Sequence, residues 1–316
     1  MKKLLLMMPF FMGYEKSLSQ ALCKQYDITL INSDEYDNNV LFDYRKCSKA
    51  HWLLRHLSKH LEKYEKERTQ SKYDELILRQ INRENDYYDV IFCINGGYVS
   101  EALFFEIREK NPKAKYVYYA WDDVGNLFSA DHIGLFDHIF SFNMCDCRLY
   151  DWSYLPMFVQ GEFIGHKEDL YDIAYIGTAH SDRIKIANKL KHLYSNKYRL
   201  YLFLYDSKLI EDGVIHNTPL SYDEYLDVLS HSRTVLDIPA EIQEGPTTRV
   251  FDALLTKTKV ISSNKKLELY PVFSENICIV DRNELKIDEA FMMKEYFETD
   301  YRSLSVHQWL QEIGIM

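Results

Sequence analysis

The chain has 316 residues, 47% hydrophobic and 27% charged, so it can bury a core and does not have the composition of a disordered protein. Its net charge of −10 argues against a nucleic-acid-binding protein that relies on overall positive charge. The six cysteines are scattered and several lie in apolar runs, so we expect reduced thiols in a cytoplasmic protein.

The first half of the chain alternates short apolar runs with helical patterns. The opening run at 4–8 is followed by Pro9 and lacks a small-residue cleavage site, so we interpret it as a buried strand and not as a signal peptide. No run reaches the roughly 18 apolar residues of a membrane-spanning helix. Further strands are expected at 27–32, 88–94, "KYVYYAW", "HIFSFN" and "YLPMFV", and helices at 17–26, 46–83 and 97–109.

The same alternation restarts near residue 171. Ser221, with Glu224 three residues later, forms a capping box that should begin a helix. The stretch 285–316 is predicted to be mostly helical. Strands are predicted at 171–177, "RLYLFLY", "TVLDIP", "KVISS" and "NICIVD", and helices at "SDRIKIANKLKHLY" and "TTRVFDALL".

Continuous apolar strands that alternate with helices indicate parallel sheets covered on both faces. Two successive runs of this kind predict an α/β protein with two Rossmann-like, doubly wound parallel-sheet domains that face each other across a cleft. We place these domains at 1–165 and 166–290, and expect 291–316 to be a helical segment that packs back on the N-terminal domain. Ligands bind such sheets at the carboxyl ends of the strands, so functional residues should directly follow strands.

A basic segment at 46–72 combines positive charge with apolar residues at helical spacing. Between Arg45 and Lys72 there are nine Lys or Arg residues and three Glu residues, with Trp52 and Leu57 among the apolar positions. One interpretation is an amphipathic helix that contacts an anionic membrane surface or a lipid-linked substrate. The alternative, favoured by the three glutamates, is a helix packed on the sheet with a solvated charged face.

The most informative stretch is "IPAEIQEGPTTRVFDAL", where a helix follows a strand. Gly245 lets the backbone approach a ligand closely, and Pro246 suits a first helical turn. Thr247 and Thr248 offer hydroxyl and N–H groups to an anion at a helix N-terminus. Arg249 adds a planar guanidinium that suits phosphate oxygens.

Asp252 lies one turn further along this helix, where a carboxylate can accept a hydrogen bond from a ribose hydroxyl. With the residues before it, it predicts a site for a nucleoside diphosphate. The alternative is a capped helix whose Arg249 pairs with Asp252 or Glu244.

Polar residues also follow strands of the first domain. Trp121-Asp122-Asp123 comes directly after "KYVYYA", and either aspartate is a candidate general base that takes a proton from an acceptor hydroxyl. The alternative is that both aspartates cap the following helix. Two other loops that follow strands are expected to line the acceptor side of the cleft, through Gly13, Tyr14, Asn95, Gly96 and Gly97.

The segment "EGPTTRVFDALLTKTKVISSN" resembles the donor site of GT-B glycosyltransferases, particularly the bacterial CgeB-like group and capsular or lipopolysaccharide enzymes. Members carry a G-x-x-x-R-x-[FW]-E-A-L run, and the broader pattern is two carboxylates separated by seven residues, as Glu244 and Asp252 are. "YDIAYIGTAHSDR" resembles the strand that opens the second domain of the same group. The likeness covers mainly residues 170–265, with an aspartate at 252 in place of the usual glutamate.

The resemblance implies a cytoplasmic glycosyltransferase, with peripheral contact to the inner face of the membrane as an option for the basic segment. The implied donor is a UDP- or GDP-sugar, the implied acceptor is a surface-polysaccharide or lipid-linked glycan, and no obligatory metal, other cofactor or nucleic acid is expected. Asp122 and Asp123 also resemble the metal-binding Asp-x-Asp of the GT-A architecture, but two successive α/β repeats favour GT-B. The donor site is implied to include Glu244, Gly245, Pro246, Thr247, Thr248, Arg249, Asp252, Gly177, Thr178 and Arg183. The nucleotide base is implied to contact the loop that ends at Leu220 and Ser221.

Two other functions are compatible with these residues. A nucleotide-sugar 2-epimerase shares the architecture, but it needs several acid and base residues around the sugar ring, and we find no such set. A non-catalytic nucleotide-sugar-binding protein would keep the phosphate site and lack the base.

Overall fold

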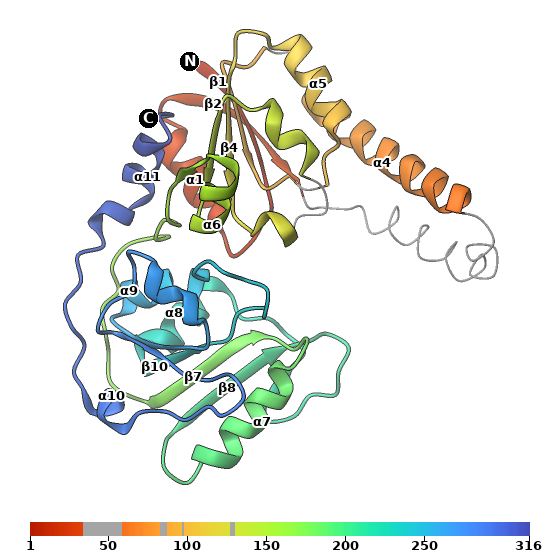
Figure 1. The fold of residues 1–316 in the computed structure, drawn as a ribbon. Helices are drawn as coiled ribbons and strands as arrows, with labels where there is room; N and C mark the ends of the chain where they lie inside the picture. Colours follow the sequence, from red (N-terminus) through yellow and green to blue (C-terminus); the bar gives the residue numbers. More distant parts are fainter. Residues whose placement is uncertain (34–58, 83–86, 97, 127–129) are drawn as a thin grey trace. The chain divides into compact units, whose positions relative to one another are not determined.

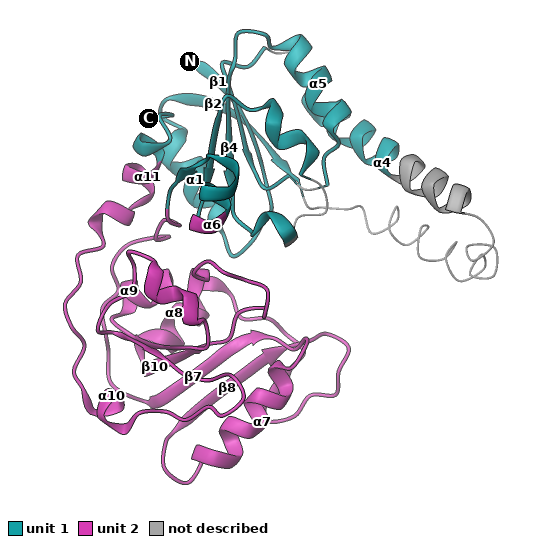
Figure 2. Cartoon of the chain, in the orientation of Figure 1, with its two compact units in different colours: residues 1–142, 146–155, 310–316 teal, residues 143–145, 156–309 magenta. Residues whose placement is uncertain are grey.

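The computed structural model describes residues 1–33, 59–82, 87–96, 98–126 and 130–316 (Figure 1). The chain forms two compact units (Figure 2). Unit 1 comprises residues 1–142, 146–155 and 310–316, and unit 2 comprises residues 143–145 and 156–309. The division therefore precedes the predicted boundary at 165, and most of the predicted terminal segment belongs to unit 2.

Unit 1 is built on a six-stranded sheet with all strands parallel, in the order β2-β1-β3-β4-β5-β6. The order reverses between β1 and β3, so the carboxyl ends of these two strands form the topological switch point of the sheet. The strands are β1 (Lys2–Met8), β2 (Tyr26–Asn32), β3 (Val90–Ile94), β4 (Lys115–Ala120), β5 (His138–Ser141) and β6 (Ser153–Tyr154).

Strand β1 is central because its side chains are apolar on both faces. Leu4 through Met8 are fully buried, and Leu5 is in register with Thr29 of β2 on one side and Ile91 of β3 on the other. A strand that is buried on both faces needs a continuous apolar run and not an alternating one.

Helices cover this sheet, and two of them form the core on one face. Helix α4 (Lys59–Asn82) contributes Tyr73 and Ile77, and helix α5 (Glu101–Lys110) contributes Phe104. The four-residue spacing puts the α4 side chains on one helical face, where each fully buried apolar side chain contributes about 1.5–3 kcal/mol. The other helices that the structure describes before residue 156 are α1 (Tyr14–Leu22), α6 (Met144–Tyr150) and the 3₁₀ turns η1 (Val124–Asn126) and η2 (Asp131–Leu135).

The last seven residues of the chain complete unit 1. Leu310 and Ile315 are buried there, the Tyr26 hydroxyl donates to the Ile315 carbonyl at 2.8 Å, and Lys115 Nζ donates to the Gly314 carbonyl at 2.8 Å. These contacts attach the C-terminal residues to β2 and β4, two elements far away in sequence.

Unit 2 also has a six-stranded parallel sheet, in the order β12-β11-β10-β7-β8-β9. Counted from β7, this is the 3-2-1-4-5-6 order of the Rossmann fold. The order reverses between β7 and β10, which sets the switch point of this sheet. The strands are β7 (Tyr171–Thr178), β8 (Leu200–Tyr205), β9 (Ile215–His216), β10 (Ser232–Asp237), β11 (Lys259–Ser262) and β12 (Ile277–Ile279).

Three helices of unit 2 each follow a strand, so their N-termini lie at the carboxyl edge of the sheet. Helix α7 (Arg183–Tyr194) follows β7, α8 (Tyr222–Ser230) follows β9, and α9 (Thr248–Thr256) follows β10. The predicted capping box of Ser221 and Glu224 is confirmed at the start of α8. The remaining elements are η3 (Lys265–Leu269), α10 (Glu289–Met293), η4 (Arg302–Leu304) and α11 (Val306–Glu312), of which α11 ends in unit 1.

The prediction of a mostly helical stretch at 285–316 is wrong, because 285–288 and 294–301 are not helical, and residues there bond to other parts of the chain. The Asn276 amide accepts from the Phe297 N–H and donates to the Phe297 carbonyl, both at 2.7 Å. Ser305, in the same stretch, forms an isolated parallel β-bridge with Val159. Val159 is the last residue of the predicted strand "YLPMFV", of which only Tyr154 lies in a strand, β6. Tertiary hydrogen bonds therefore replace the helical ones.

The predicted fold class is confirmed, because both units are six-stranded parallel sheets flanked by helices. Of the predicted basic segment 46–72, residues 46–58 lie outside the described part of the chain and 59–72 belong to α4. Among the described helices, none combines the length and the apolarity needed to cross a membrane.

Candidate functional site

The carboxyl edge of unit 2 holds an arginine and a carboxylate at the switch point between β7 and β10. Arg249, in the first turn of α9, donates from Nη1 to Asp237 at the end of β10 (2.8 Å) and from Nη2 to the carbonyl of Ile176 in β7 (2.7 Å). The side chain of Asp237 is only 1% exposed, and that of Arg249 is 15% exposed. Arg249 therefore bridges the ends of the two strands that flank the switch point.

Hydroxyl groups complete the coordination of Asp237. Thr247 Oγ1 donates to Oδ1 of Asp237 at 2.7 Å, and Ser262 Oγ at the end of β11 donates to Oδ2 at 2.8 Å. Arg249 keeps one buried N–H group, Nε, that has no acceptor within the described structure. The cluster is thus a buried ion pair in which both carboxylate oxygens of Asp237 accept hydrogen bonds.

A second arginine lies beside Gly177. Arg183 Nη1 at the start of α7 donates to Thr178 Oγ1 at 3.0 Å and to His180 Nε2 at 3.0 Å. A Cβ placed on Gly177 would lie 3.7 Å from Arg183 Nη1 and 3.8 Å from Arg249 Nη2. Burial and the nearby Arg249 charge lower the pKa of Arg183. Two guanidinium groups therefore flank a glycine at the carboxyl end of β7, which is a favourable arrangement for a polyanion.

The start of α9 differs from the prediction in one respect. The helix begins at Thr248 with Thr247 as its N-cap, so Pro246 precedes the helix and is not in its first turn. The Thr247 hydroxyl is engaged by Asp237 and makes no capping bond, which leaves the first N–H groups of α9 without a side-chain cap. Such N–H groups at a helix N-terminus attract anions.

The loop before α9 is held in place by Asn264, which follows β11. Asn264 donates from Nδ2 to the carbonyls of Glu244 (3.0 Å) and Gly245 (3.2 Å). The carboxylate of Glu244 forms an ion pair with Lys266. Gly245 is buried, so the loop presents a fixed backbone beside the helix start.

Asp252 does not fit the predicted contact to a ribose hydroxyl. Its side chain is 3% exposed, and its Oδ1 accepts from the Tyr222 hydroxyl in the first turn of α8 at 2.7 Å. Burial raises the pKa of Asp252 and hydrogen bonds from Tyr222 and Tyr225 oppose the rise, which leaves the pKa at about 7. Neither Asp252 nor Glu244 pairs with Arg249, because Asp237 takes that place. Asp252 instead links α9 to α8.

The titration of Asp252 predicts a pH dependence of stability. Between about pH 4 and 7 the folded state holds a proton on Asp252 that the unfolded chain releases, so the free energy of unfolding should fall as pH rises through this range. Asp252→Asn should remove this component in denaturation curves recorded at about pH 5 and 7.5. Asp227→Asn, at an exposed position of unit 2, should retain it. Equal pH dependence in Asp252→Asn and the unsubstituted protein would contradict the prediction.

The sequence interpretation missed three residues near the two arginines. Asp237 carries the only signal that was available, a carboxylate at the end of the "TVLD" strand. Tyr175 on β7 is 1% exposed, burial raises its pKa to about 12, and its hydroxyl has no partner in the described structure. Arg282 forms a two-bond ion pair with Asp182, at 2.6 and 2.8 Å, beside the start of α7.

The remaining predicted donor residues lie at the start of α8. Ser221 is the exposed N-cap, whose hydroxyl and N–H both contact the Glu224 carboxylate, and Leu220 precedes it and is partly exposed. Because Tyr222 follows directly, the Tyr222–Asp252 hydrogen bond ties this helix start to α9. The predicted donor residues thus gather on three helix starts and the loops before them.

In unit 1, the predicted acceptor-side residues gather at the switch point of that sheet. Gly13, with φ +83°, is the N-cap of α1 after β1, and Asn95 and Gly96 follow β3. The ring of Tyr14 meets the ring of Trp121 edge-on, with centroids 4.7 Å apart. Gly97 lies outside the described residues. The loops after β1, β3 and β4 therefore meet at one edge of the sheet.

Of the two candidate bases, Asp122 is exposed and Asp123 is 7% exposed. Asp122 Oδ2 accepts from Asn95 Nδ2 at 2.7 Å. Although the residue is exposed overall, desolvation of its carboxyl group beside Asn95 raises the pKa of Asp122, and the Asn95 hydrogen bond opposes that rise. Val124, at the start of η1, is capped by Asp146, since its N–H donates to that carboxylate at 3.0 Å. This geometry favours Asp122 over Asp123 as a base that a substrate can reach.

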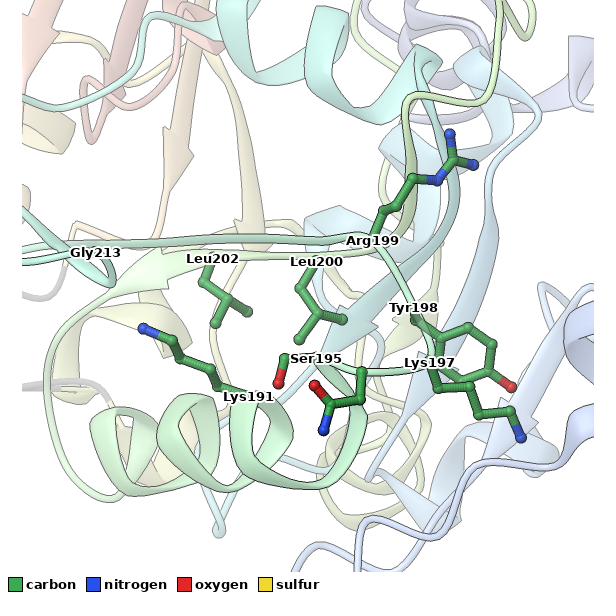
Figure 3. Close-up of a pocket in the computed structure, with 9 residues that line it drawn as sticks. Lys191, Ser195, Lys197, Tyr198, Arg199, Leu200, Leu202 and Gly213 are labelled. Atoms are coloured by element: carbon green, nitrogen blue, oxygen red, sulfur yellow. The ribbon is translucent and has the colours of Figure 1, made fainter.

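Two surface cavities of unit 2 lie at the opposite, amino edge of its sheet. One, of about 490 Å³, lies between the end of α7 and the start of β8 and is lined by Lys191, Lys197 and Arg199 (Figure 3). The other, of about 410 Å³, includes Lys259, whose pKa burial lowers to about 8. Neither coincides with the predicted donor residues.

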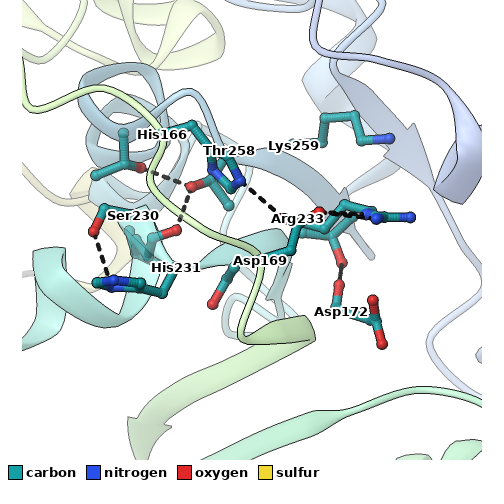
Figure 4. Close-up of polar contacts among 12 residues, drawn as sticks. His166, Asp169, Asp172, Ser230, His231, Arg233, Thr258 and Lys259 are labelled. Atoms are coloured by element: carbon teal, nitrogen blue, oxygen red, sulfur yellow. Dashed lines mark hydrogen bonds and ion pairs between the residues drawn. The ribbon is translucent and has the colours of Figure 1, made fainter.

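The network beside the second cavity fastens the segment before β7 to the sheet. Asp169 accepts from His166 at 2.9 Å and from Arg233 of β10 at 2.8 Å (Figure 4). Thr234 Oγ1 donates to the Asp172 carbonyl at 2.7 Å. These side chains form hydrogen bonds and ion pairs with one another and stabilise the fold of unit 2.

Within the described residues, no group of three or more His, Cys, Asp or Glu side chains is arranged to hold a metal ion. The expectation that catalysis needs no obligatory metal stays a prediction.

No family model and no curated protein matches the chain. Among solved structures, it is similar to an α-glucosyltransferase in complex with UDP and a 13-mer DNA containing an HMU base, with 10% identity, 88% of this chain and 82% of that chain covered, and a TM-score of 0.47. It is also similar to the DNA-modifying enzyme β-glucosyltransferase, with 11% identity, coverage of 98% and 94%, and a TM-score of 0.44.

A third similarity is to a GtfA/B complex bound to UDP and GlcNAc, at 13% identity and a TM-score of 0.31, with 77% of this chain and 56% of that chain covered. All three TM-scores are below 0.5, so the fold is assigned from the strand orders and not from these likenesses. The two strand orders show that the chain consists of two Rossmann-like α/β units. In each unit, the candidate site residues lie near the switch point of the sheet.

Proposed function

We propose that the chain is a glycosyltransferase that moves a sugar from a nucleoside-diphosphate sugar to a hydroxyl of a surface-polysaccharide or lipid-linked glycan. The observation that carries the proposal is the pair Arg183 and Arg249 around Gly177, beside the uncapped start of α9. A diphosphate has two negatively charged groups, and this edge offers two guanidinium groups and helical N–H groups without a side-chain cap to bind them.

The same groups suit the chemistry of the leaving group. As the bond between the anomeric carbon and the diphosphate oxygen breaks, the electron pair goes to that oxygen and its negative charge grows. Fixed cations and N–H dipoles that surround this oxygen stabilise the transition state more than the ground state. In the proposed reaction Arg183, Arg249 and the start of α9 supply this stabilisation without an obligatory metal.

The acceptor requires a base. We assign this role to Asp122, whose carboxylate takes the proton of the acceptor hydroxyl while the hydroxyl oxygen forms the new bond to the anomeric carbon. Its position after β4, at the carboxyl edge of unit 1, supports the assignment, as do its exposure and its raised pKa.

The first test incubates the full chain with UDP-, GDP-, CMP- and TDP-sugars. We expect one of these donors to raise the melting temperature and to release its nucleotide slowly in the absence of acceptor. Failure of every donor in both measurements would overturn the proposal. Nucleotide binding without any release, in the presence of glycan acceptors, would favour the non-catalytic alternative.

Arg183→Gln should weaken binding of the active donor by about 1.5–3 kcal/mol, or tenfold or more in Kd, because a charge-assisted bond to phosphate is lost. The matched control is Arg199→Gln, in the same unit, whose guanidinium is paired with Asp172 at the amino edge and should not affect donor affinity. Titration calorimetry measures both. Equal affinities for the two variants would remove Arg183 from the site.

A further inference from the structure

Asn95 has an unusual backbone conformation at the end of β3. Its φ is +58°, in the left-handed region that asparagine and aspartate tolerate better than most other residues. It is 4% exposed, its N–H donates to the Tyr119 carbonyl at 3.0 Å, and its carbonyl accepts from the Tyr118 hydroxyl at 2.8 Å. The backbone of Asn95 is therefore fixed to β4 from both sides.

The side chain of Asn95 points all its polar atoms at the loop after β4. Oδ1 accepts from the N–H groups of Trp121 (2.7 Å) and Asp122 (3.2 Å), and Nδ2 donates to the carboxylate of Asp122 (2.7 Å). The two backbone donors decide which end of the amide is the oxygen, so the amide nitrogen must face Asp122. One side chain thus holds both the backbone and the carboxylate of Asp122.

Neighbouring contacts make this arrangement rigid. Gly96 follows with φ +61°, and a Cβ there would come within 2.6 Å of Cys93 Sγ, so the turn requires glycine. The ring of Trp121 is held against Tyr14 of α1. Both features keep the loop that carries Asp122 in the position that Asn95 sets.

We propose that Asn95 is a positioning residue, which aims the Asp122 carboxylate and holds it in the ionised form that accepts a proton from the acceptor hydroxyl. The inference rests on the proposed function and deepens it. A hydrogen bond donated to a carboxylate favours its charged form, whereas loss of water around the carboxylate favours the neutral form. Asn95 opposes the second effect directly.

Besides Tyr14 and Tyr118, three titratable groups among the described residues lie near this loop. Asp123 is adjacent and buried, and Asp146 of α6 accepts from Val124. His132 of η2 is fully buried, and its Nε2–H donates to the Asn95 carbonyl at 3.1 Å. Because burial lowers the pKa of His132, this ring is neutral near pH 7, so it places no positive charge near the carboxylate of Asp122.

The test is the pH profile of kcat for sugar transfer by the full chain carrying Asn95→Asp. The new carboxylate keeps the acceptor for the two N–H groups and the left-handed backbone, but replaces the donor to Asp122 with a negative charge. The acid limb of the profile, where Asp122 gains its proton, should move to higher pH by about one unit or more. Asn95→Gly, which also tolerates positive φ, should move it in the same direction by less.

The matched control is Asn111→Asp. Asn111 is 5% exposed in the same unit, accepts from the Tyr88 N–H at 2.8 Å and donates to the Ile107 carbonyl at 2.9 Å, without contact to Asp122. The acid limb of the kcat profile of Asn111→Asp should coincide with that of the unsubstituted protein.

A purely structural role for Asn95 predicts a different result, in which activity falls by the same factor at every pH and the limb does not move. That outcome, in folded variants with normal donor affinity, overturns the inference and leaves the proposed function intact. If the unsubstituted chain transfers no sugar from any donor, the proposed function fails and the inference fails with it.

Discussion

Arg249→Ala is expected to lower the free energy of unfolding by about 3–5 kcal/mol, because it leaves the carboxylate of Asp237 buried without its cation. Asp237 is 1% exposed, and the hydroxyls of Thr247 and Ser262 that still donate to it carry no charge. Chemical denaturation monitored by circular dichroism measures the loss. Arg302→Ala, whose arginine is 88% exposed in the same unit, is the matched control and should leave the midpoint unchanged.

The double variant Arg249→Ala with Asp237→Asn separates the ion pair from packing. If the penalty comes from an unpaired charge, neutralising Asp237 should recover part of the stability lost in Arg249→Ala, so that the two effects are not additive. An Arg249→Ala protein as stable as the parent would show that the pair is unimportant for unit 2. Donor affinity should be measured only under conditions in which the variant is folded.

Asp122→Asn should lower kcat by about 10²–10⁴-fold while the donor Kd stays within about twofold, because a general base contributes to proton transfer and not to donor binding. Asparagine keeps the size of the side chain and removes its basicity. The donor residues belong to unit 2, whereas Asp122 belongs to unit 1.

Asp137→Asn is a suitable control for this measurement, since Asp137 is a partly exposed carboxylate of unit 1 that pairs with Arg108 at the amino edge of the sheet. Its kcat should match that of the parent. Unchanged turnover in Asp122→Asn would remove the base from the proposal and would favour a protein that binds nucleotide sugars without transferring them.

The regular part of the fold was predictable because its signals are local. Strand β1 and strand β7 are apolar runs buried on both faces, and the Ser221 capping box lies within four residues. The carboxyl-edge rule then placed Asp122 in the loop after β4 and Arg249 at the start of the helix that follows β10. These features need only the sequence and the geometry of parallel sheets.

The partners of the site residues were not predictable, since they are set by packing between distant segments. Asp237 is twelve residues before Arg249, and nothing in the sequence distinguishes it as a partner from Glu244 or Asp252. The direction of the Asp252 carboxylate depends on Tyr222, thirty residues earlier, which the fold brings from α8. The extended course of Phe297 likewise depends on Asn276.

Unit 1 is built from segments at both ends of the sequence, which affects the order in which the units can be completed during synthesis. Residues 310–316, which receive the hydrogen bonds of Tyr26 and Lys115, are translated only after the whole of unit 2. During synthesis, unit 1 therefore lacks its contacts with 310–316 until unit 2 has been translated. Unit 2 can fold before unit 1 is complete. A fragment that ends before Leu310 would leave the hydrogen bonds of Tyr26 and Lys115 to these residues unformed.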